Sequence, residues 1–201
     1  MNSEDIKTAA LCWLRWGRQY PFVATEVGRW SADVLGATKT TMTEVEVKIS
    51  KSDLKADFVK PKHKFYAEIS PLYRGAGWLP NQMYFAVPEE LQEFALTALQ
   101  EKNPKYGLLV FKEGLPNGHN LTCMRTAKKL HQASPSPKVL EQFVLRMGSE
   151  ICNFHAYSHR YRSWLEEMKH EAKHMSGASD ADPEPHAIME EGEKKDAPET
   201  G

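Results

Sequence analysis

Short apolar runs alternate with longer amphipathic stretches along most of this chain. Apolar runs at residues 83–88 and 106–111 predict two buried strands, and residues 89–102 between them show helical spacing. A strand, a helix and a strand in this order predict a parallel crossover connection. An N-terminal helix is predicted to run through Leu14, with Ser3 as its cap. The longest helix is predicted over residues 136–154, with an apolar stripe that packs against the sheet and a polar, solvated extension beyond it.

A hairpin predicted over residues 31–49 carries charged side chains. If its turn is centred just after Lys39, antiparallel pairing places residue i opposite residue 79 − i, so that Asp33 faces Glu46. Side chains alternate across a strand, so Glu46 and Lys48 share one face. Two acids and a lysine are therefore expected to converge.

Two interpretations of these three residues are open. Carboxylates about 5 Å apart repel each other unless a proton or a cation lies between them, and a divalent ion with oxygen ligands is a natural occupant. The alternative is an exposed hairpin face on which Lys48 offsets Asp33 and Glu46. Glu26 ends a strand predicted within residues 20–30, and it is either a third acid near the site or an ordinary exposed residue.

A basic segment follows the hairpin. Ser50 or Ser52 is expected to cap a helix, which Pro61 interrupts. Lysines and aromatic residues alternate on its expected exposed side, a composition that can bind phosphates and stack on bases; a solvated helix face is the alternative. The candidate nucleic-acid contacts are Ser50, Lys55, Lys60, Lys62, His63, Lys64 and Tyr66.

Charge and composition separate one domain from a tail. Residues 1–174 are expected to form a single domain, with its core at about residues 20–155, and the acidic residues 175–201 are expected to be disordered. From Ser176 onward the formal charge is −6, whereas the whole chain carries −1, so the rest carries +5. That balance is compatible with a polyanionic partner such as DNA, and the acidic tail is a candidate binding segment for a protein partner.

The cysteines and the lengths of the apolar runs indicate the cellular compartment in which the protein is expected. Cys12, Cys123 and Cys152 are scattered and have no zinc-type pairing, so a reducing cytosol is expected, with the thiols buried and inert. No run approaches the eighteen or so apolar residues needed to span a bilayer, and no basic and then apolar segment opens the chain. A soluble, cytoplasmic protein without membrane contact is expected.

Asp33, the Glu46-Val47-Lys48 triplet, the helix start at residues 50–57 and the strand at residues 84–88 together resemble the PD-(D/E)XK nuclease superfamily. Within it, the segments EVKISKSDLKADF, YFAVPEEL and YGLLVF are similar to MmcB-like DNA-repair and restriction-endonuclease-like proteins. The resemblance covers roughly residues 20–155. One departure is Ala32, which stands before Asp33 where the family motif has proline.

The resemblance implies an α/β fold with a restriction-endonuclease-like core, in which a mixed central sheet is flanked by helices. It implies that Asp33 and Glu46 bind magnesium or manganese, that Lys48 orients or activates the attacking water, and that Glu26 sits where some members place another acid. The implied function is metal-dependent hydrolysis of DNA phosphodiester bonds, in DNA repair or in the processing of phage or host DNA.

Two further expectations belong to the resemblance. The alternative function is a catalytically inactive nuclease-fold module that binds nucleic acid or protein, because a fold does not fix a function. Many nucleases need two subunits to cut both strands, so a homodimer is an arrangement that the family allows.

Overall fold

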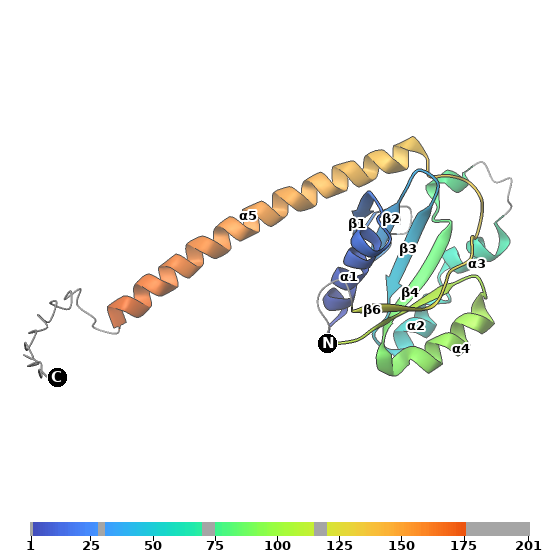
Figure 1. Cartoon of the computed structure of the whole chain (residues 1–201), viewed down its shortest axis with the longest axis horizontal. Helices are drawn as coiled ribbons and strands as arrows, with labels where there is room; N and C mark the ends of the chain where they lie inside the picture. The colour runs from blue at the N-terminus through green and yellow to red at the C-terminus, as the bar shows by residue number, and fades with distance from the viewer. Residues whose placement is uncertain (1, 28–30, 70–74, 115–119, 176–201) are drawn as a thin grey trace, which may run out of the picture. The chain divides into compact units, whose positions relative to one another are not determined.

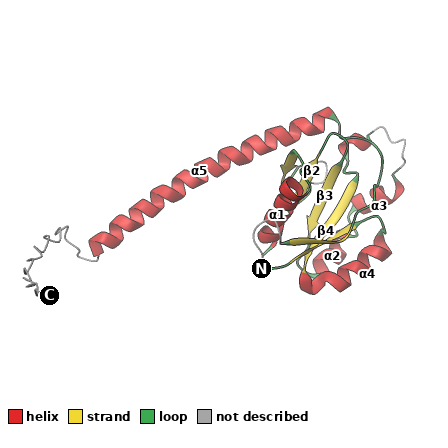
Figure 2. Ribbon diagram, in the orientation of Figure 1, coloured by secondary structure: helices red, strands yellow, loops and turns green. Residues whose placement is uncertain are grey.

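A mixed six-stranded sheet with helices on both faces forms the body of this computed structural model (Figures 1 and 2). The structure describes residues 2–27, 31–69, 75–114 and 120–175. In chain order the elements are α1 (Ser3–Cys12), η1 (Trp13–Gly17), β1 (Phe22–Ala24), β2 (Val34–Ala37), β3 (Met42–Val47), α2 (Lys51–Asp57), α3 (Pro61–Glu68), η2 (Ala76–Trp78), β4 (Gln82–Pro88), η3 (Glu89–Leu91), α4 (Gln92–Lys102), β5 (Gly107–Phe111), β6 (Leu121–Arg125) and α5 (Pro137–Met175). The predicted α/β class, with a mixed sheet flanked by helices and a long C-terminal helix, is confirmed.

The strands lie side by side in the order in which they occur in the chain. Strands β1, β2 and β3 form an antiparallel meander, β3, β4 and β5 are parallel, and β6 pairs antiparallel with β5 at the edge. Strand β2 pairs Val34 with Val45 and Leu35 with Glu44, so the predicted hairpin register is confirmed. The parallel crossover from β4 through α4 to β5 is also confirmed.

Alternation along the central strands directs apolar side chains to hydrophobic cores on both faces of the sheet. Val45 and Val47 of β3 pack on the face that α1 covers. Phe85 and Val87 of β4 pack on the opposite face, with Leu54 of α2 and the buried side of α4. Because Glu44 and Glu46 alternate with the two valines, β3 directs two acids toward the layer formed by α2, α3 and α4.

Two local predictions near the N-terminus need correction. The cap of α1 is Asn2, which accepts a hydrogen bond from the Asp5 N–H at 2.9 Å, and not Ser3. The strand predicted within residues 20–30 has only three residues, and Glu26 beyond it has a φ of 52°. A positive φ takes a non-glycine residue out of the extended conformation, so Glu26 cannot continue the strand.

The cysteines are free, but the prediction that all three are buried is wrong. Cys12 is half-buried, and Cys123 and Cys152 are exposed. Cys123 lies on the edge strand β6, whose central residues face solvent, and Cys152 lies on an exposed part of α5. An edge strand and a helix with one packed face both leave such positions open to water.

Helix α5 extends without a break over 39 residues. Val139 and Phe143 are buried against residues of β1 and β2, but Ile151 and Phe154, which were predicted to pack on the sheet, are exposed. The predicted continuation of the helix beyond Phe154 is confirmed. The chain divides into two units, Met1–Phe154 and His155–Gly201, and the tail predicted to be disordered lies outside the described residues from residue 176 onward.

No helix within the described ranges is both long enough and apolar enough to cross a membrane.

Candidate active site

Asp33, Glu46 and Lys48 lie where β2 begins and β3 ends. Asp33 directly precedes β2, and its Oδ2 accepts a hydrogen bond from the backbone N–H of Val47 at 2.8 Å. Lys48 Nζ donates to Glu46 Oε2 at 2.9 Å. The Asp33 carboxylate is therefore held against the backbone of the residue that separates Glu46 from Lys48.

Asp33 is the most accessible of the three side chains. Its side chain is 23% exposed, whereas those of Glu46 and Lys48 are 5% and 6% exposed. Burial raises the pKa of Asp33, and the negative charge of Glu46 raises it further, while the Val47 N–H and the ammonium groups of Lys48 and Lys7 act against both. Asp33 therefore interacts electrostatically with both Glu46 and Lys48.

Lys62 of α3 binds both acids of β3. Its Nζ donates to Glu44 Oε1 at 2.8 Å and to Glu46 Oε1 at 2.6 Å, and Tyr66 O–H donates to Glu44 Oε2 at 2.8 Å. The prediction that Lys62, His63 and Tyr66 face solvent is wrong, because all three are buried. Buried carboxylates require hydrogen-bonding partners, and this face of α3 supplies them.

Asp57, at the end of α2, anchors a second set of contacts. Its Oδ1 lies 3.3 Å from Lys48 Nζ and also pairs with Lys60, and its Oδ2 lies 2.8 Å from His63 Nε2. The other ring nitrogen of His63 lies 2.8 Å from the Tyr106 hydroxyl. Although burial alone would raise the pKa of Asp57, the hydrogen bonds from His63 and Lys60 outweigh it and hold that pKa well below its usual range.

We call these groups the lysine–acid network, which consists of Glu44, Glu46, Asp57, Lys48, Lys60 and Lys62. Burial would raise the pKa of Glu46, but Lys62 and Lys48 outweigh it and lower that pKa. Burial would lower the pKa of Lys48, but Glu46 and Asp57 outweigh it and raise that pKa. Glu46 is therefore a carboxylate and Lys48 an ammonium, so Lys48 is available as a fixed cation and not as a base.

Glu44 and Asp57 belong to this network but were not among the predicted site residues. For Glu44 a signal was present, because residues 44, 46 and 48 share one strand face. Burial raises the pKa of Glu44 to about 7, with Lys62 acting against it and Glu46 adding to it. Glu44 is buried, and the cost of a charge in that environment lets it retain a proton up to near-neutral pH.

The titration of Glu44 should be visible in stability. The folded chain binds an extra proton between the ordinary pKa of 4.5 and the folded value of about 7, so this stabilisation is complete below pH 4.5 and is lost as pH rises through 7. His63 and His131, whose pKa values burial lowers, act in the opposite sense. The quantity to measure is therefore the difference in unfolding free energy between wild type and Glu44→Gln.

Measured by urea denaturation, the unfolding free energy of wild type minus that of Glu44→Gln should fall by about 2 kcal/mol as pH rises from 5 to 8. Glu93→Gln, at an exposed position on α4, should show no such shift. An unchanged difference between wild type and Glu44→Gln across this range would contradict the assignment of the proton to Glu44.

Asp33 and Glu46 provide oxygen donors for a magnesium or manganese ion. Asp33 Oδ1 lies 3.8 Å from Lys7 Nζ, longer than a hydrogen bond, whereas both Glu46 oxygens accept hydrogen bonds from lysines. Within the described parts of the chain, no three His, Cys, Asp or Glu side chains are grouped to hold a metal ion. Magnesium is commonly bound by one or two carboxylates, with water and phosphate completing its shell, and Asp33 and Glu46 are the carboxylates that would hold such an ion here. An ion would compete with lysines at Glu46.

Glu26 is connected to this region through a lysine. Lys7 Nζ lies 4.0 Å from Glu26 Oε1 and 3.8 Å from Asp33 Oδ1. The Glu26 side chain is 47% exposed. The structure therefore places Glu26 next to the cation that neighbours Asp33.

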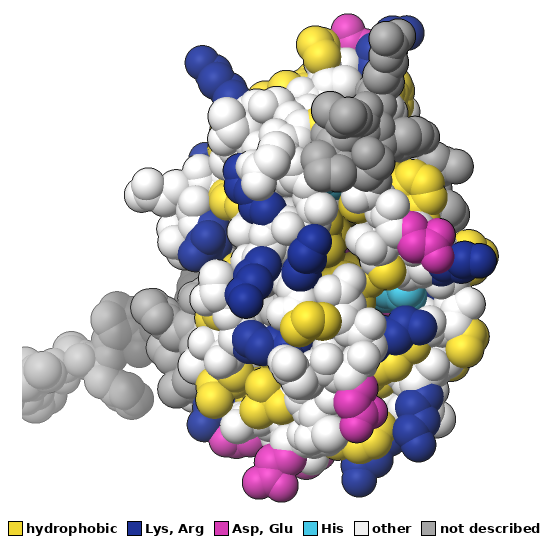
Figure 3. Space-filling model, turned by 90° about the vertical axis from the view of Figure 1, so that its right-hand side faces the viewer, with side chains coloured by type: hydrophobic (Ala, Val, Ile, Leu, Met, Phe, Trp, Pro, Cys, Tyr) yellow, Lys and Arg dark blue, Asp and Glu magenta, His cyan; other side chains and the backbone are white. Residues whose placement is uncertain are grey.

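The remaining predicted nucleic-acid contacts lie on α2 and α3. Ser50 caps α2 by accepting a hydrogen bond from the Asp53 N–H at 3.1 Å, and Lys55, Lys60 and Lys64 are exposed. The side of the molecule that carries α3 and α4 in Figure 1 displays scattered Lys and Arg side chains, together with apolar and a few acidic ones (Figure 3).

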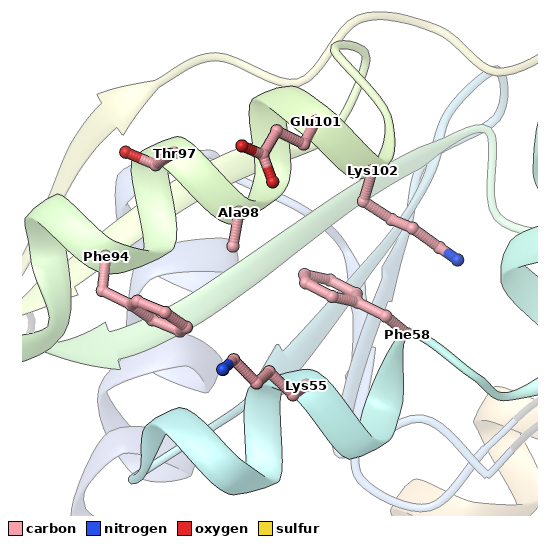
Figure 4. Close-up of a pocket in the computed structure, with 7 residues that line it drawn as sticks. All are labelled: Lys55, Phe58, Phe94, Thr97, Ala98, Glu101 and Lys102. Carbon is pink, nitrogen blue, oxygen red and sulfur yellow. The ribbon is translucent and has the colours of Figure 1, made fainter.

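A groove of about 550 Å³ lies between α2 and α4. Figure 4 shows Phe58 and Phe94 on either side of it, and Lys55 pointing toward Phe94. The ammonium groups of Lys51 and Lys55 lie 5.4 Å and 5.6 Å from the centroid of the Phe94 ring. The groove therefore combines apolar ring surface with positive charge.

Comparison with known proteins adds little to this geometry. No protein-family model matches the chain, and the search of curated proteins found no match. A solved structure described as the SPO1766 protein of unknown function from Silicibacter pomeroyi is similar, with 17% identity over 90% of this chain and 98% of that chain and a TM-score of 0.47. A likeness at this level carries no argument about function.

Proposed function

We propose that this chain is a metal-dependent nuclease-like protein that hydrolyses DNA phosphodiester bonds at Asp33, Glu46 and Lys48. The observation that carries the proposal is the hydrogen bond that holds the Asp33 carboxylate at Val47, between Glu46 and Lys48. The PD-(D/E)XK resemblance of the same three residues supports it. DNA repair or the processing of phage or host DNA in the cytoplasm is the expected setting.

The three residues have distinct tasks in this proposal. Asp33 and Glu46 would hold a magnesium or manganese ion, which, when bound, polarises a phosphoryl oxygen and lowers the pKa of a bound water. Lys48, kept charged by Glu46 and Asp57, stabilises the negative charge that develops on the phosphate. Asp57 acts as a positioning residue for Lys48 through their 3.3 Å contact.

Exposed lysines near this site would hold the DNA backbone. Lys55, Lys60 and Lys64 provide cations that pair with phosphates, and such contacts are strongest at low salt. Phe58 and Phe94 line the groove beside Lys55, where they offer ring surface for a base.

A cleavage assay tests the proposal. Wild type should cut single-stranded, duplex or branched DNA in the presence of magnesium or manganese and should lose that activity when the metal is chelated. Glu46→Gln should abolish cleavage because it removes the charge of one proposed ligand. Glu68→Gln, at an exposed position at the end of α3, should leave the activity intact.

A second candidate is a nuclease-fold module that binds DNA without cutting it. The observation that favours it is the saturation of both Glu46 oxygens by Lys48 and Lys62, which is an obstacle to metal binding. If wild type and Glu46→Gln bind DNA alike and neither cuts it, this candidate replaces the first. An absence of DNA binding even at low salt would exclude both.

A further inference from the structure

An apolar stripe on α5 is exposed to solvent beyond Met147. Ile151 is 57% exposed, Phe154 is 69% exposed and Tyr161 is 51% exposed. The stripe belongs to a helix of 39 residues, whereas helices in globular proteins average about 12. Contiguous exposed apolar surface of this kind marks a site of interaction.

The stripe follows a heptad repeat through residue 172. Its members recur at alternating steps of three and four residues, which is the spacing that keeps one seam at the contact line of two supercoiled helices. The seam consists of Ile151, Phe154, Ser158, Tyr161, Leu165, Met168 and Ala172. Positions a of the heptad are Ile151, Ser158, Leu165 and Ala172, and positions d are Phe154, Tyr161 and Met168. Three consecutive heptads with a single polar member predict a coiled coil.

We propose that residues 151–172 of α5 form a parallel, two-stranded coiled coil with the same residues of a second copy of this chain. In a parallel pair in register, each seam residue meets its own counterpart, so apolar side chains cover each other along the seam. The polar Ser158 near the middle of the seam selects this register, because a shift would bury its hydroxyl against an apolar side chain.

The flanking positions favour the parallel direction. Positions e carry His155, Arg162 and Lys169, and positions g include Tyr157 and Trp164. In a parallel pair Tyr157 of one copy faces Arg162 of the other, and Trp164 faces Lys169, which are cation–π contacts. In an antiparallel pair positions e face each other, which would bring Arg162 and Lys169 of the two copies together as like charges. Tyr157 and Trp164 are 72% and 50% exposed, so both rings are accessible.

The mass of the full chain in solution tests the dimer. Sedimentation equilibrium at micromolar concentration should give twice the 22.9 kDa of one chain for wild type. The double variant Tyr161→Glu/Met168→Glu places charge in the seam and should give the mass of one chain. The matched control Ala156→Glu/Ser163→Glu adds the same charges at two exposed f positions of the same segment and should remain dimeric.

Disulfide formation tests the direction. In a chain with Cys12, Cys123 and Cys152 replaced by serine, Met168→Cys should cross-link to its counterpart under mild oxidation. In an antiparallel pair centred on the seam, the two residues at position 168 would lie roughly 20 Å apart, beyond disulfide reach.

Three results would overturn the proposal: a wild-type chain with the mass of one copy, a dimer that survives Tyr161→Glu/Met168→Glu, or a dimer in which Met168→Cys does not cross-link. If wild type has the mass of one chain, we would infer that the seam binds a different protein. Near-ultraviolet circular dichroism should show the folded α/β unit in both glutamate double variants, since their substituted residues lie outside Met1–Phe154. The proposal is independent of the proposed nuclease function.

Discussion

Lys62→Met should lower the unfolding free energy by about 3–5 kcal/mol, because it removes one partner from a buried ion pair. Lys62 is 3% exposed, and its Nζ is within 2.8 Å of both Glu44 and Glu46. Methionine has a similar length but leaves the buried Glu44 without its cation, and Glu46 with Lys48 alone. Thermal unfolding should shift downward by on the order of 10 °C.

Two variants separate this effect from the general loss of a lysine. Lys64→Met removes an exposed lysine from the same helix and should change stability by less than about 0.5 kcal/mol. Adding Glu44→Gln to Lys62→Met should restore part of the lost unfolding free energy, because the buried acid that has lost its lysine is replaced by a neutral amide. A loss under about 1 kcal/mol for Lys62→Met would mean that the network does not hold the buried acids.

Lys48→Met should slow DNA cleavage by about 10²–10³-fold at saturating DNA, as expected when one group that stabilises transition-state charge is removed. The Lys48 ammonium is fixed at 2.9 Å from Glu46 and 3.3 Å from Asp57, so neither water nor an exposed lysine can replace it in the same place. The affinity for DNA should change little, because the side chain is only 6% exposed.

Lys64→Met is also the matched comparison for this effect. Its exposed ammonium is expected to contact the DNA backbone, so the variant should weaken binding and reduce the salt dependence by about one phosphate contact while cleavage at saturating DNA stays the same. The contrast between a rate effect and a binding effect distinguishes a catalytic from a binding lysine. Equal rate losses in both variants would contradict the assigned role of Lys48.

The sequence predicted the hairpin well because its determinants are local. Strand alternation and the position of the turn after Lys39 are enough to pair Val34 with Val45, and hence to bring Asp33 toward Glu46. Ser50 and Pro61 likewise mark the starts of α2 and α3 through capping and the missing proline N–H. None of these outcomes depends on what packs above the hairpin.

The sequence could not predict which side of α3 faces the sheet. A lysine-rich helix is usually interpreted as solvated, but Lys62, His63 and Tyr66 point inward because Glu44 and Asp57 are buried and require partners. That requirement arises only when distant segments meet. For α5 the heptad spacing beyond Phe154 was present in the sequence, but Tyr161, Leu165 and Met168 are interspersed with charged residues, and the segment was interpreted as polar.

The proposed function depends most directly on Asp33 as a ligand for a catalytic metal. Asp33→Asn is the sharpest variant for this claim, because the asparagine Oδ1 can still accept the Val47 N–H hydrogen bond while the charge that binds a cation is lost. The measurement is the rate of magnesium- or manganese-dependent DNA cleavage by wild type and Asp33→Asn, with thermal unfolding of both as a check on the fold. We expect cleavage by wild type and a loss of at least about 100-fold in the variant at an unchanged unfolding temperature. Equal rates in the two proteins, or no cleavage by wild type with either metal, would contradict it.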